Sequence, residues 1–161
     1  MKNKKGFTLV ELLAVIVILA LIMGIAVVSI GGVLTSSREK TYRETAASLI
    51  NGVRQQLYVQ NKVAEGYYCF TESILEKGGT QSPYGGDYNY GCPSGVESVG
   101  GGVSKYGTSA TTPSCSATQD AYVHVTENAG VYTYSICLSD GTKYLNEANE
   151  QTLLDNSAAI S

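Results

Sequence analysis

The sequence has little of what most catalytic sites use. Its 161 residues include no tryptophan and one histidine, and only 16% of them are charged, against the usual quarter or so. The lone histidine, His124, lies in an alternating stretch typical of a strand. Glu72, Glu76 and Asp87 form no recognisable acid pair, and no serine stands in a nucleophile elbow. We therefore predict no enzyme, with no catalytic or cofactor-binding residue.

The charged residues are unevenly distributed. Residues 1–34 hold three lysines and one acid, Glu11, whereas residues 35–161 hold eight basic and thirteen acidic side chains. This excess of acid argues against direct nucleic-acid binding, because counterion release needs a basic surface. Intrinsic disorder is also disfavoured, since the chain has twelve tyrosines.

One long apolar run lies near the N-terminus. Residues 12–28 contain no charged or polar side chain, and a helix of about 20 such residues spans a ~30 Å hydrocarbon core. Lys2, Lys4 and Lys5 precede the run, which predicts a single cytoplasmic-membrane span with the N-terminus inside and residues 35–161 exported. The run is too long for an ordinary secretory signal, and no small-residue cleavage site follows it.

Residues 4–13 read KKGFTLVELL, which resembles the class III signal of type IV prepilins and type II secretion-like pseudopilins. The resemblance implies that a prepilin peptidase cleaves after Gly6 and N-methylates Phe7. It also implies that Glu11 neutralises the N-terminal amine of a neighbouring subunit in a filament. The sequence lacks the proline that many members carry further along this segment, and we expect glycines at 24, 31 and 32 to loosen the helix there.

Physical chemistry gives Glu11 the same importance. A charged side chain within a membrane-spanning helix costs up to ~2.5–3.5 kcal/mol at the helix centre, so this carboxylate needs a partner. After cleavage, the amine of Phe7 would lie about one turn away on the same helix face. Glu11 is therefore the predicted assembly residue, together with Phe7.

The exported part combines a helix with strands. An apolar stripe predicts that the helix continues through residues 35–66 and packs against a sheet; its members are Tyr42, Ala46, Leu49, Ile50, Val53 and Leu57. Residues 67–119 are predicted as a Gly-rich loop region with one short helical turn at 72–77, and 147–161 as a tail or short helix. Between them, residues 120–146 alternate as a β-meander with strands at 121–125, 131–138 and 142–145, one face turned to solvent.

The predicted fold is α+β and pilin-like, with a long N-terminal helix packed on a small antiparallel sheet. The predicted division is a basic leader at 1–6, a transmembrane and filament-core helix at 7–34, and an exported head at 35–161. Residues 83–88 also resemble a Pro-aromatic-Gly-x-x-Tyr segment of major pseudopilins, in which a nearby loop binds calcium. Asp87 and Asp140 are the available carboxylates, but no dense acidic loop surrounds them, so we predict no metal.

The four cysteines, at 69, 92, 115 and 137, all lie in the exported part. None stands in the close pair that a zinc site needs, so two disulfides are predicted. Four cysteines allow three connectivities. We favour Cys69–Cys92 and Cys115–Cys137, each closing a loop worth ~3 kcal/mol in the chain-entropy model.

The resemblance implies a structural subunit of a type IV pilus or pseudopilus, at the cell surface or in the cell envelope of a bacterium. Its expected partners are the prepilin peptidase, copies of itself, other pilins, the assembly platform and the membrane before assembly. Such filaments serve adhesion, motility, DNA uptake or protein secretion. The alternative, from a different functional class, is an extracellular binding module that an uncleaved signal anchor holds in the membrane. A minor subunit at the filament tip is a third possibility, although such subunits often lack the glutamate found here at position 11.

Overall fold

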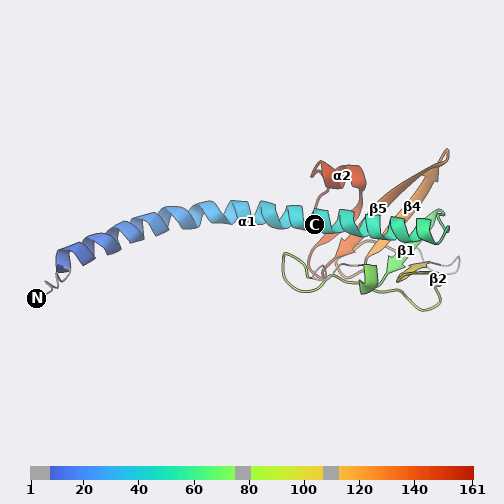
Figure 1. Cartoon of the computed structure of the whole chain (residues 1–161), viewed down its shortest axis with the longest axis horizontal. Helices are drawn as coiled ribbons and strands as arrows, with labels where there is room; N and C mark the ends of the chain where they lie inside the picture. The colour runs from blue at the N-terminus through green and yellow to red at the C-terminus, as the bar shows by residue number, and fades with distance from the viewer. Residues whose placement is uncertain (1–7, 75–80, 107–112) are drawn as a thin grey trace, which may run out of the picture. The chain divides into compact units, whose positions relative to one another are not determined.

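A computed structural model describes residues 8–74, 81–106 and 113–161 of the chain (Figure 1). The chain divides into two compact units, Met1–Ser37 and Arg38–Ser161. The first unit contributes helix only, and the second contains the sheet.

Helix α1 spans Leu9–Val59 and so enters both units. Its predicted end at residue 66 is wrong, because a C-terminal cap closes the helix earlier. The Lys62 N–H donates to the Leu57 carbonyl at 3.0 Å, the Asn61 N–H donates to the Tyr58 carbonyl at 3.0 Å, and Asn61 has a φ of +51°. This is the Schellman arrangement, and asparagine is one of the few residues that accept its left-handed position.

The sheet of the second unit is antiparallel and has six strands in the order β2-β3-β1-β4-β5-β6. Its elements, with the short helices, are β1 Gly66–Phe70, η1 Glu72–Ile74, β2 Glu97–Gly100, β3 Val103–Lys105, β4 Tyr122–Asn128, β5 Val131–Ser139, β6 Tyr144–Asn149 and α2 Glu150–Leu154. The helix-on-antiparallel-sheet arrangement confirms the predicted α+β, pilin-like fold.

Three of these strands lie where the sequence predicts a loop region. The YYCF run of β1 consists of strand-forming residues, and β1 lies inside the sheet between β3 and β4. Strands β2 and β3 are short and are joined through Gly100, Gly101 and Gly102, whose φ angles are all positive. These glycines form a tight turn between paired strands. The predicted turn at residues 72–77 is described only as far as Ile74.

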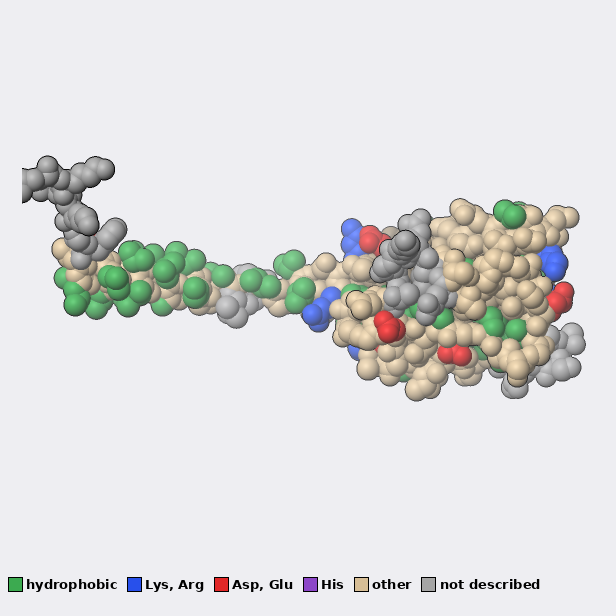
Figure 2. Space-filling model, turned by 60° about the horizontal axis from the view of Figure 1, so that its bottom comes forward, with side chains coloured by type: hydrophobic (Ala, Val, Ile, Leu, Met, Phe, Trp, Pro, Cys, Tyr) green, Lys and Arg blue, Asp and Glu red, His purple; other side chains and the backbone are tan. Residues whose placement is uncertain are grey.

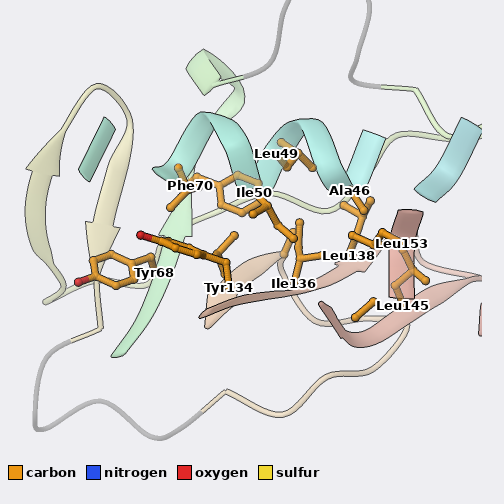
Figure 3. Packing of buried hydrophobic residues seen from close by; sticks show 14 of the residues in the cluster. Ala46, Leu49, Ile50, Tyr68, Phe70, Tyr134, Ile136, Leu138, Leu145 and Leu153 are labelled. Carbon is orange, nitrogen blue, oxygen red and sulfur yellow. The ribbon is translucent and has the colours of Figure 1, made fainter. Parts of the chain in front are cut away.

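The core lies between α1 and one face of the sheet, as Figure 3 shows. The predicted stripe is confirmed: its six members, from Tyr42 to Leu57, are all at most 1% exposed. The sheet contributes alternate residues of its strands, including Tyr68, Val123, Ile136 and Leu145. The twofold alternation of the strands and the helical period of α1 therefore converge on one apolar layer.

The opposite face of the sheet is only partly open to solvent, which corrects the expectation for the meander. Tyr122 stands on this face between Cys69 on β1 and Cys137 on β5, and it is completely buried. The structure joins Cys69 to Cys92 and Cys115 to Cys137, the pairing favoured from the sequence. Each disulfide therefore joins a strand next to Tyr122 to a segment outside the sheet, the first through Cys92 and the second through Cys115.

The C-terminal segment forms a strand and then a short helix. Strand β6 continues to Asn149, whose side chain accepts a hydrogen bond from the Thr152 N–H and caps α2. Leu153 of α2 joins the core, and the Ser161 N–H donates to the Tyr144 carbonyl at 3.0 Å. The short-helix alternative is therefore correct for residues 150–154.

Candidate functional site

The first turn of α1 is organised by a reciprocal pair of side chains. The Thr8 N–H and the Thr8 hydroxyl both donate to Oε2 of Glu11 at 2.9 Å, and the Glu11 N–H donates to Oγ1 of Thr8 at 3.4 Å. This is a capping box, in which a threonine at the N-cap and a glutamate three residues later satisfy each other's backbone donors. It fixes the start of the helix at Leu9.

The capping box gives the Glu11 carboxylate a partner within its own chain, in addition to the amine expected from a neighbouring subunit. The Thr-x-x-Glu spacing ahead of an apolar run is a recognisable helix start, so the sequence carries a signal for this contact. Both hydrogen bonds end on Oε2, and within the described residues Oε1 accepts none. The predicted processing residues, Gly6 and Phe7, lie outside the described residues.

After this turn, the helix of the first unit is apolar all round. The window Leu9–Ala26 is long and apolar enough to cross a membrane, and none of it is buried within the chain. Figure 2 shows hydrophobic side chains covering this part of the helix. Soluble monomers rarely expose so large a continuous apolar surface. A lipid bilayer or other protein chains must cover this surface.

Comparison with known families identifies this segment. Residues 1–27 match the family model described as the prokaryotic N-terminal methylation motif. The segment is the class III signal of type IV pilins. The matched range includes Gly6, Phe7 and Glu11. No curated protein and no solved structure matches the chain. The matched range ends before residues 83–88, so likeness to a pseudopilin stays a prediction.

In the head, Asp140 is the most heavily hydrogen-bonded carboxylate among the described residues. Its Oδ1 accepts from the Thr142 hydroxyl at 2.8 Å and from the N–H groups of Thr142 and Lys143 at 3.0 and 2.7 Å, while Oδ2 accepts from the Ser82 hydroxyl. Burial disfavours the charged form, but these hydrogen bonds outweigh burial and lower the pKa of Asp140. Asp140 thus ties the loop containing Ser82 to the β5–β6 turn.

Asp87, the other carboxylate considered for calcium, is exposed and does not share this arrangement. Within residues 8–74, 81–106 and 113–161, no group of three or more His, Cys, Asp or Glu side chains could hold a metal ion.

Several tyrosines connect α1 to the loop that follows η1. The Tyr42 ring lies 5.2 Å from Tyr88 and 5.8 Å from Tyr84, in tilted or edge-on contacts. Its hydroxyl donates to the carbonyl oxygens of Leu138 and Lys143 at 3.2 and 3.1 Å. Burial raises the pKa of Tyr42 and raises that of Tyr88 to about 12. These rings pack the head and hold the loop on the helix.

The histidine belongs to a cross-strand cluster on the outer face of the sheet. Its ring stacks on Tyr67 with 4.0 Å between centroids, and Nδ1 of His124 lies 3.5 Å from Oε2 of Glu147. The Tyr122 hydroxyl donates to the other oxygen of that carboxylate at 2.9 Å. His124 therefore lies in a strand, as its alternating sequence predicts, with its ring against a residue of the neighbouring strand.

Proposed function

We propose that the chain is the precursor of a type IV pilus or pseudopilus subunit, and that the mature subunit assembles into a filament through residues 7–34. One observation carries the proposal: the methylation motif leads directly into an apolar helix that none of the described residues covers. A filament of packed copies would cover it after the subunit leaves the membrane. The transfer costs little, because one apolar environment replaces another.

The capping box supports a defined role for Glu11 in this assembly. Oε2 of Glu11 accepts hydrogen bonds from Thr8 of the same chain, and among the described residues no group donates to Oε1, where a donor from another subunit would bind. The free amine that cleavage after Gly6 would create at Phe7 of a neighbouring subunit is such a donor. One charge pair per subunit would then favour a single stacking register, because any other register leaves a carboxylate unpaired in apolar surroundings.

Processing and location follow from the same signal. The prepilin peptidase would cleave after Gly6 at the cytoplasmic membrane face and methylate the new amine of Phe7. Before assembly the subunit would span the membrane with its N-terminus inside and its head outside, where the two disulfides form. Assembly would then involve the platform and other pilins, and place the head on a filament at the cell surface or in the cell envelope.

The experiment is mass spectrometry of the mature N-terminus in membranes and in sheared surface material. An N-methylated Phe7 in sheared filaments is the expected result. A chain that keeps its leader and is found only in membranes would overturn the proposal and favour an anchored extracellular binding module.

A pair of variants tests the assembly residue. Glu11→Ala should deplete the sheared fraction while leaving the protein in the membrane. Glu44→Ala is the matched control, because Glu44 is an exposed glutamate of the same helix whose ion pair with Lys40 lies on the surface. If both variants assemble equally well, Glu11 has no special role.

A further inference from the structure

One edge of the sheet is incomplete. The last pair between β5 and β6 joins Ser135 to Asn149, whereas β5 begins at Val131. Residues 131–134 therefore have β4 on one side and, within the described part of the chain, no paired strand on the other. After Asn149 the chain turns into α2 instead of continuing along β5. We call residues 131–134 the β5 edge, and Figure 1 shows this end of the β4–β5 hairpin projecting beyond the other strands.

The hairpin turn determines which backbone groups face outward. Ala129 and Gly130 have φ angles of +50° and +81°, as a two-residue type I′ turn requires. The residues flanking such a turn, Asn128 and Val131, exchange hydrogen bonds with each other. Because outward and inward residues alternate in an antiparallel ladder, Tyr132 and Tyr134 turn their N–H and C=O groups toward this side of β5. The Ser135–Asn149 pair uses the Tyr134 carbonyl as acceptor for the Glu150 N–H, so the groups that face the open edge are the N–H and C=O of Tyr132 and the N–H of Tyr134.

The β5 edge lacks the usual protection against strand pairing. It reads VYTY, with no charge, proline or glycine, and Val131 and Tyr132 are 63% and 37% exposed. The opposite edge strand, β2, carries Glu97, and the Lys62 ammonium donates to the backbone carbonyl of Ser98 at 3.4 Å. Charged side chains, lysine above all, are the common means of blocking an edge. The β2 edge is therefore protected, and β6 is covered at Tyr144 and Leu145 by the C-terminal residues, whereas the β5 edge has neither kind of protection.

A groove of about 630 Å³ runs beside the β5 edge. Polar side chains line it from both β5 and β6, including Thr133, Ser135 and Asn149. Its charged lining consists of the carboxylates of Glu147 and Glu150, and neither lysine nor arginine lines it among the described residues. Arg54 is paired with Glu150, and its guanidinium lies 4.5 Å from the centroid of the Tyr134 ring. Glu147 is therefore the groove carboxylate that has no lysine or arginine partner among the described residues. A ligand complementary to this groove is extended, pairs through its backbone, and carries positive charge.

We propose that the β5 edge binds an extended, basic segment of another polypeptide by strand addition, with alternate side chains of that segment lying in the groove. Backbone hydrogen bonds to Tyr132 and to the Tyr134 N–H would supply affinity, and Glu147 would select lysine or arginine. This interaction surface is separate from the apolar helix and goes beyond the filament function.

The first test uses the full chain in detergent micelles and a fluorescently labelled hexapeptide of alternating lysine and valine, followed by anisotropy. Two control peptides are matched to it: one replaces lysine by glutamate, and one is N-methylated at alternate backbone nitrogens. Each change should weaken binding by about tenfold or more. Failure of the lysine peptide to bind, or equal binding of the N-methylated peptide, would overturn strand addition.

The second test uses two substitutions at one position. Tyr132→Pro removes an outward N–H without touching the ladder to β4, and should abolish binding. Tyr132→Ala keeps the N–H and should bind within a few-fold of the original chain. Near-ultraviolet circular dichroism shows whether each variant is folded. If Tyr132→Pro does not fold, the N-methylated peptide still tests strand addition, because it is measured on the unaltered chain.

A second copy of the chain is the competing occupant. Three results together would show that the β5 edge pairs with the β5 edge of a second copy. The chain would associate in micelles, Tyr132→Pro would make it monomeric, and the lysine peptide would not compete with the association. These results would overturn the basic-peptide proposal.

Discussion

At the scale of single residues, Glu11 and Asp140 are two carboxylates that each close a turn through local hydrogen bonds. Glu11 holds the start of α1 through Thr8, and Asp140 holds the β5–β6 turn through Thr142 and Lys143. Both are carboxylates receiving backbone donors, an arrangement roughly twice as strong as a bond between neutral groups. Substitution of either should therefore have local and measurable effects.

Removing the cap should loosen the first turn of α1. We expect Thr8→Ala to destabilise that turn by about 1 kcal/mol, because an N-cap side chain satisfies a backbone donor that otherwise has no partner. Amide hydrogen exchange of Glu11 and Leu12, whose N–H groups donate to Thr8, should then accelerate roughly fivefold in micelles. Thr8→Ser, which keeps the hydroxyl, is the control and should exchange at nearly the original rate. Equal exchange in all three chains would show that the cap does not form.

The hydrogen bonds to Asp140 should make stability of the head depend on pH. At pH 7, Asp140→Asn should lower the free energy of unfolding by about 2 kcal/mol, because the amide is uncharged and a poorer acceptor. The pKa of Asp140 is lowered in the folded chain, so its contribution is full above the ordinary aspartate value near 3.8 and is lost as pH falls further. Denaturant melts should show the free energies of unfolding of the two chains converging as pH falls below about 3.8.

Asp87→Asn provides the comparison for that series, because Asp87 is an exposed carboxylate of the same region. It should change the free energy of unfolding by less than about 0.5 kcal/mol throughout. If the difference in free energy of unfolding between Asp140→Asn and the original chain stayed constant down to pH 2, that result would contradict an ionised Asp140 in the folded head.

At the scale of elements, packing of α1 on the sheet dominates the head. Leu49 is 1% exposed and lies in the core, so Leu49→Ala should cost about 2–5 kcal/mol through lost burial and a cavity. Val59, on the same helix, is 77% exposed, and Val59→Ala should cost less than about 0.5 kcal/mol. Thermal unfolding of both variants measures the contrast. Similar costs would mean that the helix does not pack as described.

The elements differ in how far sequence predicts them. The stripe from Tyr42 to Leu57 repeats over several turns, so its period identifies both the helix and its buried face. The end of α1 depends on a single residue, Asn61, accepting a left-handed conformation, which periodicity does not reveal. Strands β1, β2 and β3 have three to five residues each, too few for a reliable alternation, and glycine-rich sequence surrounds two of them.

In the candidate site, too, local sequence patterns predict some features and not others. The order of Gly6, Phe7 and Glu11 identifies the signal, and the Thr-x-x-Glu spacing beside it is a local pattern typical of a capping box. No local pattern predicts the β5 edge, because it exists only where β6 stops pairing after Asn149. Pairing between distant strands is a property of the folded chain.

At the scale of the whole molecule, the two units have opposite requirements. The first exposes an apolar helix that needs lipid or other chains around it, whereas the second buries its own core. Among the described residues, no core residue precedes Tyr42, although α1 begins at Leu9. The core of the head is therefore contained in residues 38–161, and the two parts have separable stabilities.

A truncation tests this separation. Residues 38–161 alone, exported to an oxidising compartment, should form a soluble protein with both disulfides, and its thermal midpoint should lie within about 4 °C of the head in the full chain. A shorter chain, 48–161, loses Tyr42 and Ala46 with their packing and the hydroxyl bonds to Leu138 and Lys143, so its midpoint should fall by about 10 °C or more. Calorimetry of the three chains gives the comparison. If 38–161 were as unstable as 48–161, the first unit would have to contribute to the head, and the apolar helix could not be free to serve assembly alone.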